Sequence, residues 1–156
     1  MAERKYSKYI IKDDLSDPPP PGFLKRVEEQ RAQGNYLEST HLFALNDKII
    51  PGSFHVDCVW FWEKKGDAQN QSEIAHAHDW DEAWIFSGMD RENPRELGAE
   101  LDFWLGDEQY IIDKACLVFV PRGLQHGPCG IRRIDSPVFF CTMGNGTRYD
   151  RSSGDE

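Results

Sequence analysis

Two short segments hold most of the side chains that could bind a metal ion. The first runs from His76 to Glu82 and reads H-x-H-x-x-x-E, which offers two imidazoles and a carboxylate. The second is the turn Pro121-Arg122-Gly123, followed by His126. Together they contain three of the chain's five histidines. Neutral imidazole binds first-row divalent metals and a carboxylate adds charge, so these residue types favour a metal site.

Strands are the elements that would position these side chains. Alternate residues of a β-strand share a face, so His76 and His78 can point the same way. Residues 79–81 can turn the chain and bring Glu82 back, and His126 arrives from a distant strand. Three imidazoles and one carboxylate leave two positions of an octahedral ion open. Open positions are what a catalytic ion needs, whereas closed sites are structural.

The two segments resemble the conserved motifs of the cupin family over residues 54–143. The first motif matches His76, His78, Glu82 and Gly88, and the second matches Pro121, Gly123 and His126. The resemblance implies a small antiparallel jelly-roll barrel that binds one metal ion. Its implied ligands are His76, His78, Glu82 and His126.

The chain departs from the family pattern at four places that are not ligands. One is that the first motif often ends with a glycine one residue later than Gly88. The first motif usually opens with a glycine where this chain has Asn70, and asparagine tolerates the same left-handed turn. The second motif often has a glycine at the place of Ala115 and an asparagine at that of Gly130. These departures concern the subfamily, and hence the substrate, more than the site.

Short strands with turns between them dominate the rest of the chain. The expected strands are 55–62, 73–78, 82–87, 100–105, 109–112, 116–120, 131–134 and 137–143, preceded by strand-like sequence from about residue 40. Residues 66–72 read as a polar loop. Eight or nine short strands in one small domain predict an all-β fold, an antiparallel jelly-roll β-barrel over residues 40–143.

The two ends of the chain differ from this strand region. Residues 1–39 are expected to form an extended arm and a short helix that pack on the barrel or on a partner subunit. The run Pro18–Gly22 favours polyproline conformation rather than helix, and the helix is expected over Phe23–Gln33 with Gly34 as its stop. Residues 144–156 are polar, and we expect a frayed tail.

Alternation along the strands predicts which side chains line the cavity. If Glu82 points inward, Trp84 and Phe86 do so too. Phe86 is interpreted as core filling, and Trp84 as a substrate contact. Arg122 and Gln125 flank the third histidine and complete the predicted substrate-binding set, since an arginine can clamp a carboxylate with two hydrogen bonds. The alternative for Arg122 is an ordinary surface arginine, because turn residues are mostly solvated.

Several other residues carry weaker signals. His41 and His55 are isolated, and we interpret them as structural histidines with satisfied partners. Trp80 lies in the turn between ligands, at the barrel mouth or capping it. The consecutive apolar residues 59–62 need cover on both faces. One face would meet the barrel interior, and the other the arm or a second subunit, so we predict a homodimer.

Composition narrows the possible partners and location. The chain of 156 residues fits one domain, and its net charge of −9 disfavours nucleic acid and anionic membranes. No apolar run is long enough to span a membrane, and residues 1–9 lack a signal peptide's apolar stretch. The four cysteines form no C-x-x-C pair and read as buried free thiols. We therefore expect a cytoplasmic protein.

These observations leave more than one function open. The first hypothesis is a metal-dependent cupin enzyme acting on a small organic molecule, for example as a dioxygenase, isomerase, decarboxylase or lyase. Its ion would be Fe, Mn, Ni, Zn, Co or Cu, which ligand types alone do not distinguish. The alternative is a non-catalytic protein that binds a small ligand. A purely structural metal site is disfavoured because four protein ligands leave an octahedral ion open.

Overall fold

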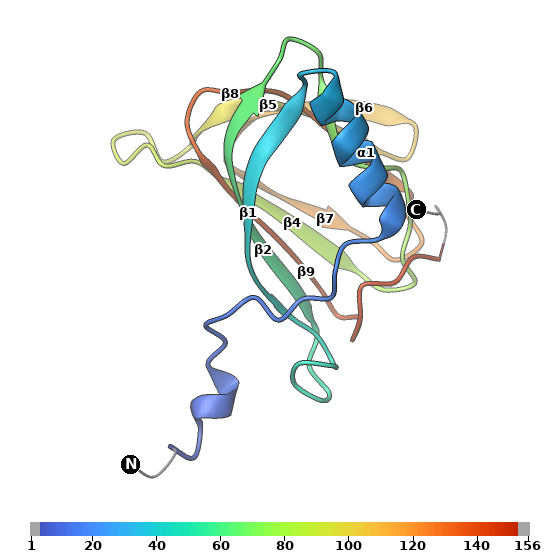
Figure 1. Cartoon of the computed structure of the whole chain (residues 1–156). Coiled ribbons are helices and arrows are strands. Elements are labelled where there is room, and N and C mark those ends of the chain that lie inside the picture. Colours follow the sequence, from blue (N-terminus) through green and yellow to red (C-terminus); the bar gives the residue numbers. More distant parts are fainter. Residues whose placement is uncertain (1–3, 153–156) are drawn as a thin grey trace.

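Antiparallel pairing organises residues 36–144 into two sheets, with the α-helix α1 (Pro21–Ala32) beside them (Figure 1). This computed structural model describes residues 4–152. The outermost residues of the predicted arm and tail, 1–3 and 153–156, lie outside the described residues. The elements in chain order are η1 (Ser7–Tyr9), α1 (Pro21–Ala32), β1 (Tyr36–Leu45), β2 (His55–Lys65), β3 (Asn70–Glu73), β4 (Glu82–Ser87), β5 (Glu96–Leu105), β6 (Glu108–Lys114), β7 (Cys116–Val120), β8 (His126–Ile134) and β9 (Val138–Gly144).

The strand order is that of a jelly roll. One sheet has the order β1-β2-β9-β4-β7 and the other has the order β3-β8-β5-β6. All the strand pairs are antiparallel. The predicted antiparallel jelly roll is confirmed. Over residues 4–152 its main-chain hydrogen bonds leave two separate sheets, so the shell is not closed into one continuous barrel.

The strand predictions succeed where the sequence is mainly apolar and fail where it is polar. Predicted strands 82–87 and 116–120 coincide with β4 and β7. The prediction of a loop at 66–72 followed by a strand at 73–78 was wrong. Instead, β3 spans Asn70–Glu73, and beyond it only an isolated bridge pairs His76 with His126. Because β3 is an edge strand made of polar residues, its side chains carry no apolar alternation.

The helix begins earlier than predicted. Pro21 and Gly22 form its first turn, so the expectation that the proline run excludes helix was wrong at its end. Proline is tolerated there because the first helical residue has no intrahelical partner for its N–H. Gly34, at a φ of 71°, ends the helix as predicted, and its N–H donates to the main-chain oxygen of Arg31.

The N-terminal segment packs on the sheets of its own chain. In α1, the side chain of Gln30 both donates to and accepts from the main chain of Gln71 in β3. Further upstream, Oδ2 of Asp14 lies 2.9 Å from Nδ1 of His41 in β1. Within the chain, this segment thus contacts β1 and β3. Packing of the arm on a partner subunit, the other predicted placement, stays a prediction.

The inward faces of both sheets form one apolar core. Strand β4 alternates as predicted, with Glu82, Trp84 and Phe86 buried. On β5, Leu101 and Phe103 are each 1% exposed, and Leu105 packs against the same apolar core. Core packing of Trp84 and Phe86 thus fixes β4, the strand that begins at Glu82.

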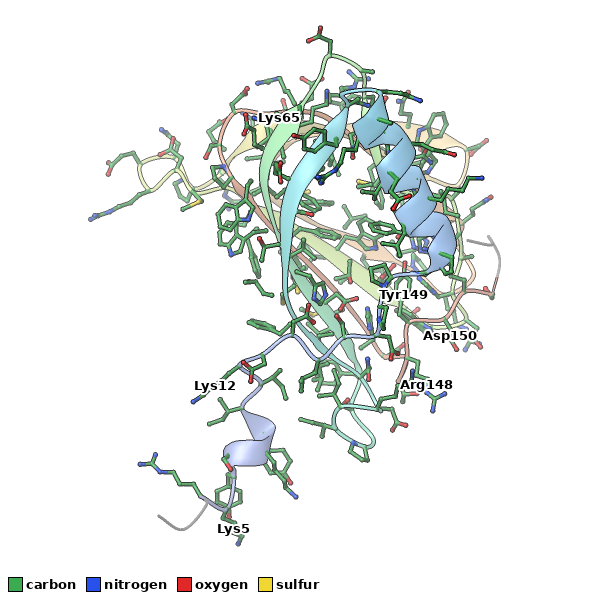
Figure 2. All side chains as sticks on the ribbon, viewed as in Figure 1. Lys5, Lys12, Lys65, Arg148, Tyr149 and Asp150 are labelled. Carbon is green, nitrogen blue, oxygen red and sulfur yellow. The ribbon has the colours of Figure 1, made fainter. Side chains whose placement is uncertain are left out.

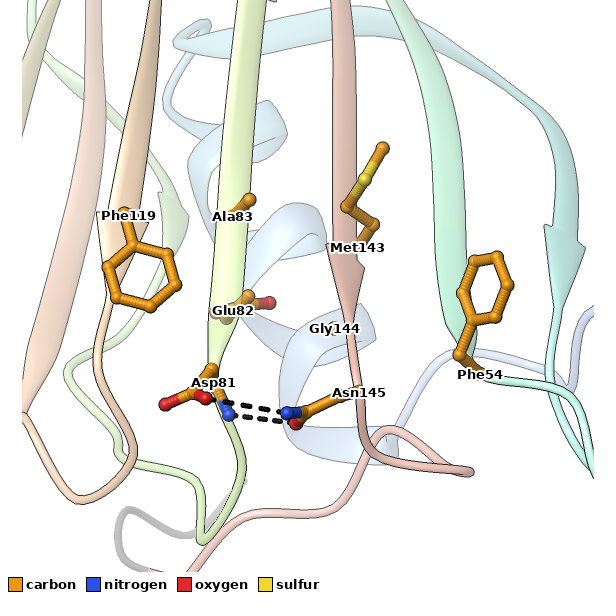
Figure 3. A pocket seen from close by; sticks show the side chains of 8 residues that line it. All are labelled: Phe54, Asp81, Glu82, Ala83, Phe119, Met143, Gly144 and Asn145. Atoms are coloured by element: carbon orange, nitrogen blue, oxygen red, sulfur yellow. Dashed lines mark hydrogen bonds between the residues drawn. The ribbon is translucent and has the colours of Figure 1, made fainter.

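The outward face of the five-stranded sheet is also apolar. Phe61 points into the core, whereas Trp62 is 43% exposed, so the prediction of a strand apolar on both faces is confirmed. On β7, Leu117 and Phe119 are 61% and 58% exposed. This face carries an open depression of about 410 Å³, and Figure 3 shows the side chains that line it. It is lined by Phe54, Asp81, Glu82, Ala83, Phe119, Met143, Gly144 and Asn145.

Two further predictions concern thiols and membranes. All four cysteines are free, with three buried and Cys116 half-buried, which confirms the prediction of buried thiols in large part. Among residues 4–152, neither helix has the length and apolar character needed to cross a membrane.

Candidate metal centre

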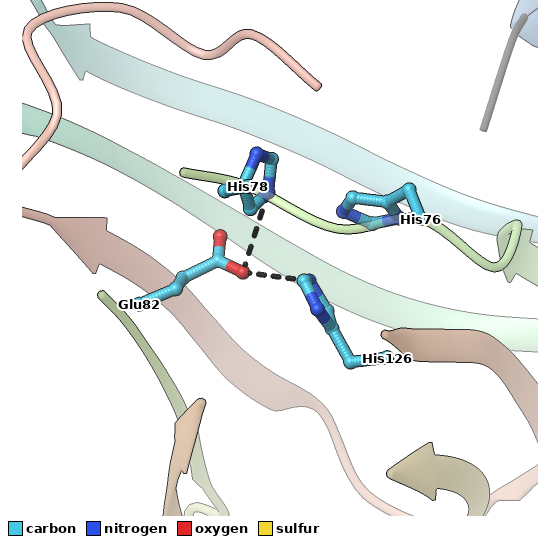
Figure 4. Close-up of side chains that lie close together, drawn as sticks. All are labelled: His76, His78, Glu82 and His126. Atoms are coloured by element: carbon cyan, nitrogen blue, oxygen red, sulfur yellow. Dashed lines mark ion pairs between the residues drawn. The ribbon is translucent and has the colours of Figure 1, made fainter. Parts of the chain in front are cut away.

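Four buried side chains converge between the two sheets (Figure 4). His76 and His78 lie on the segment between β3 and β4, Glu82 begins β4, and His126 begins β8. The main chains of His76 and His126 donate to each other's oxygens at 2.9 and 2.8 Å, which ties the segments together. Each of the four residues is at most 1% exposed, and one ligand atom from each lies within 4.8 Å of the others. We call these four residues the His/Glu cluster.

The main chain fixes how each imidazole is turned. In all three histidines of the cluster, Nδ1 lies at hydrogen-bond distance from a main-chain oxygen. The three acceptors belong to Ile74 at 2.8 Å from His76, Leu124 at 3.1 Å from His126, and Asp150 next to His78. A carbonyl oxygen can only accept, so each Nδ1 carries the proton and each Nε2 carries the lone pair. Such outer partners orient metal-binding histidines.

The lone pairs of two of these imidazoles face a carboxylate. Nε2 of His126 lies 2.9 Å from Oε2 of Glu82, and Nε2 of His78 lies 3.6 Å from it. The 2.9 Å approach lacks the geometry of a hydrogen bond, and Oε1 of Glu82 also has no partner among residues 4–152. Buried acceptors that face one another without a donor are costly. A cation between them removes that cost, so the donor set fits a metal ion.

Burial keeps two of the imidazoles neutral. Loss of hydration lowers the pKa of His76 to about 3, and it also lowers the pKa of His78. Metal ions bind the neutral form of imidazole, and protons compete with them for the same nitrogen. Both rings are therefore in their metal-binding form across the neutral pH range.

Trp84 contacts the cluster through its polar edge. Its Nε1 donates a 2.6 Å hydrogen bond to Oε2 of Glu82, and its ring lies edge-on to His126 with centroids 5.9 Å apart. Trp84 is 3% exposed and also packs against Phe103. The structure thus places this predicted substrate contact beside the cluster and shows an orienting role that the sequence did not suggest.

Arg122 and Gln125 lie on the exposed turn before His126. The main-chain N–H of Arg122 donates to Asp81, and the main-chain oxygen of Gln125 accepts from Gly106. The structure does not bring either side chain into the His/Glu cluster. The exposed position of Arg122 matches the alternative of a surface arginine, and a substrate-binding role for the pair stays a prediction.

The expectation of a frayed tail after Gly144 was wrong for residues 145–152, which we call the C-terminal strap. At its start, Asn145 hydrogen-bonds Asp81 through both main chain and side chain. At its end, the N–H of Ser152 donates to the oxygen of Ala77, between the first two ligands. Figure 2 shows Tyr149 and Asp150 on this segment, against the body of the molecule. The polar groups of the strap thus find main-chain and side-chain partners beside the cluster.

Trp80 joins the strap to the cluster. It is 7% exposed, stacks on His78 at 4.1 Å, and donates from Nε1 to Oδ1 of Asp150 at 3.0 Å. A Cβ atom at Gly144 or Gly146 would lie 2.0 or 2.6 Å from its ring. Only glycine lets the main chain pass so close to the indole. Trp80 lies between the strap and His78 and covers the cluster on this side, which corresponds to the capping position, one of the two that we predicted.

Sequence reasoning missed Tyr149. Its hydroxyl donates a 2.9 Å hydrogen bond to Nε2 of His76, the atom that would bind the ion. The same hydroxyl lies 3.5 Å from Oε2 of Glu73, whose Oε1 accepts from Arg151 at 2.8 Å. The available signal was an aromatic residue three positions after Gly146 in an otherwise polar tail.

The two remaining histidines have different environments. His41 lies between Asp57 at 3.1 Å and Asp14, as expected of a satisfied structural histidine. The same expectation was wrong for His55, which is 2% exposed and whose ring nitrogens make no hydrogen bond to any described residue. Its Nε2 lies 3.5 Å from Oδ2 of Asp57. Its ring packs 5.1 Å from that of Tyr149, and burial lowers its pKa. His55 therefore lines the interior beside the cluster.

Comparison with known proteins identifies the fold. No protein-family model matches this chain, and no curated protein matches it in sequence. A recombinant oxalate oxidase in complex with glycolate is similar in structure, with a TM-score of 0.50, 12% identity, and coverage of 92% of this chain and 62% of that chain. The chain thus spans about three fifths of that oxidase, and 53% of another oxalate oxidase chain that it matches.

Two smaller proteins also match. A protein with a double-stranded β-helix domain from Klebsiella pneumoniae has a TM-score of 0.46 and 9% identity, covering 77% of this chain and 85% of that chain. An RmlC-like cupin from Shewanella frigidimarina has a TM-score of 0.40 and 14% identity, covering 70% and 77%. At these identities the likeness concerns the fold alone.

Proposed function

We propose that this chain, which has the fold of the cupin superfamily, is a metal-dependent enzyme acting on a small organic molecule. One observation carries the proposal: the Nε2 lone pairs of His78 and His126 face the buried Glu82 carboxylate, and neither these nitrogens nor Oε1 of Glu82 have a hydrogen-bond donor among residues 4–152. The proposed ligands are His76, His78, Glu82 and His126. The ion is a single divalent transition metal, drawn from Fe, Mn, Ni, Zn, Co and Cu. When bound, such an ion acts as a Lewis acid toward substrate oxygen atoms.

The chain's own residues have defined tasks in this proposal. Trp84 orients the Glu82 carboxylate through its 2.6 Å hydrogen bond. Trp80 and the C-terminal strap exclude water from the cluster. The aromatic face of Trp84 is a proposed substrate contact, and Arg122 and Gln125 remain proposed contacts at the rim.

A non-catalytic ligand-binding protein is the second candidate. The covered state of the His/Glu cluster supports it, because every member is at most 1% exposed beneath the strap. Under this alternative the ion would hold a small ligand without turnover. We further propose a cytoplasmic homodimer whose partners are small molecules rather than nucleic acid or membrane, on the strength of the acidic net charge and the apolar outer sheet face.

A substrate panel separates the two candidates. Protein loaded with Fe(II) under air, and then with each other ion, is offered catechols, β-diketones, keto acids and sugars. Oxalate and glycolate are added because they are named in the matched oxidase structures. Turnover that is lost in His126→Ala and kept in His41→Gln, a histidine outside the cluster, supports the enzyme. Binding without turnover across the whole panel supports the ligand-binding protein.

A further inference from the structure

We propose that the Tyr149 hydroxyl occupies one of the open coordination positions of the metal ion in the resting protein, and that a substrate must displace it. This inference rests on the proposed metal site and assigns a fifth protein ligand, carried by the C-terminal strap. It makes the strap a built-in competitor for substrate.

The first argument is distance. Metal bonds of about 2.1 Å at right angles put neighbouring donor atoms roughly 3 Å apart. Oη of Tyr149 lies 2.9 Å from Nε2 of His76, and the same 2.9 Å separates Glu82 from His126 within the cluster. The distance from the hydroxyl to Nε2 of His76 therefore matches the distance expected between two ligand atoms that share one ion.

The second argument is that the hydroxyl proton has another acceptor. In the described contacts the hydroxyl donates to the lone pair of His76, which an ion would claim. Oε2 of Glu73 lies 3.5 Å from the same oxygen and can take over as acceptor. Glu73 is held in place by Arg151, whose Nη2 donates to its Oε1 at 2.8 Å. The phenol oxygen then turns its lone pairs to the ion.

The third argument is that the ring is fixed from several sides. It lies 5.0 Å from the ring of His78 and 5.1 Å from that of His55, and the Arg151 guanidinium stands 5.6 Å from its centroid. The next residue, Asp150, is bound by Trp80 through its side chain and by His78 through its main-chain oxygen. The strap thus holds the hydroxyl at the cluster. Through Asp150 the strap is also linked to His78, a proposed ligand that a bound substrate would disturb.

Tyr149→Phe removes the oxygen and keeps the ring, and Tyr110→Phe on β6 is the matched control. Each protein is assayed for metal content and thermal unfolding, then loaded with Fe(III) and with Co(II). Iron(III) binds a tyrosine oxygen as the phenolate, and Oε2 of Glu73, 3.5 Å away, can take its proton. The iron–phenolate pair absorbs visible light by charge transfer, so this band reports Tyr149 directly. Azide titration of the Co(II) forms reports how open the site is.

We expect one ion per chain in all three proteins. The visible band should be present in the wild type and in Tyr110→Phe, and lost in Tyr149→Phe. Azide should bind Tyr149→Phe at least about tenfold more tightly, since no hydroxyl must be displaced. A wild type that binds iron without the band, or a band that survives in Tyr149→Phe, overturns the inference. So does weaker azide binding by Tyr149→Phe, which would mean that the hydroxyl donates to bound anions. Absence of metal from every protein would instead refute the proposed function.

Discussion

Trp84 donates a hydrogen bond of 2.6 Å to the carboxylate of Glu82, its neighbour two positions earlier on β4. The pleat of the strand sends both side chains to the same inner face, where they are 3% and 1% exposed. The Nε2 atoms of His78 and His126 approach the same oxygen of this carboxylate, Oε2. The indole therefore anchors a charged group that would otherwise be free to turn away from them.

Trp84→Phe should weaken metal binding without unfolding the protein. The phenyl ring keeps most of the apolar packing but loses the N–H that orients Glu82, and loss of such an outer partner costs about 10–100-fold in metal affinity. Competition with a chelator measures the change. Trp62→Phe on the outer face is the control and should bind metal like the wild type. Equal affinities for wild type and Trp84→Phe would show that the hydrogen bond does not position the carboxylate.

Gly146→Ala should loosen the C-terminal strap. The new methyl group would lie 2.6 Å from the ring of Trp80, so either the strap or the indole must move. Overpacking of this kind costs about 1–3 kcal/mol in the free energy of unfolding. Urea unfolding measures the loss. In a Trp80→Leu background the same change should cost much less, because the clash partner is gone. An equal loss of unfolding free energy in both backgrounds would show that the clash with Trp80 is not the cause.

Alternation and motif spacing predicted the ligand strand and the four side chains of the His/Glu cluster. The pattern of Glu82, Trp84 and Phe86 sets both the strand and its inner face, and core packing does not override it. Strand β3 could not be predicted in this way, because Asn70–Glu73 is polar and its strand state comes from pairing with β8.

The strap was missed for a different physical reason. Residues 145–152 have no apolar pattern, and their order comes from hydrogen bonds to Asp81, Ala77 and Trp80, which are distant in sequence. Composition suggested a solvated tail, whereas long-range partners decide the outcome. The role of Trp84 was half visible: its inward direction follows from the pleat, but its hydrogen bond to Glu82 depends on side-chain geometry.

The stability of the protein should depend on pH through His41. Its hydrogen bond to Asp57, supported by Asp14, raises the pKa of His41 above its ordinary 6.5. A raised folded pKa means that the imidazolium stabilises the fold fully below 6.5, and that this contribution is lost as pH rises through the folded value. His41→Gln should therefore lower the free energy of unfolding most at acidic pH. The difference between wild type and variant should shrink as the pH rises through the pKa of folded His41. NMR titration of His41 checks the pKa, and a value below 6.5 would contradict the assignment.

The outer face of the five-stranded sheet should mediate the proposed homodimer. Leu117 and Phe119 are more than half exposed on β7, and exposed apolar clusters on soluble domains mark interaction sites. Phe119→Glu should give a monomer in size-exclusion chromatography with light scattering. Ile111→Glu on β6 of the other sheet is equally disruptive in chemistry and should leave the dimer intact. A monomeric wild type at micromolar concentration would remove the dimer.

The metal content of the purified protein tests the central claim most directly. Elemental analysis should find one transition-metal ion per chain in the wild type and in His41→Gln, and a large loss in His126→Ala, where one imidazole of the cluster is missing. The opposite result would be a carefully handled wild type that contains no such ion and rebinds none of Mn, Fe, Co, Ni, Cu or Zn. In that case the inward-facing lone pairs of the His/Glu cluster would not be a metal site.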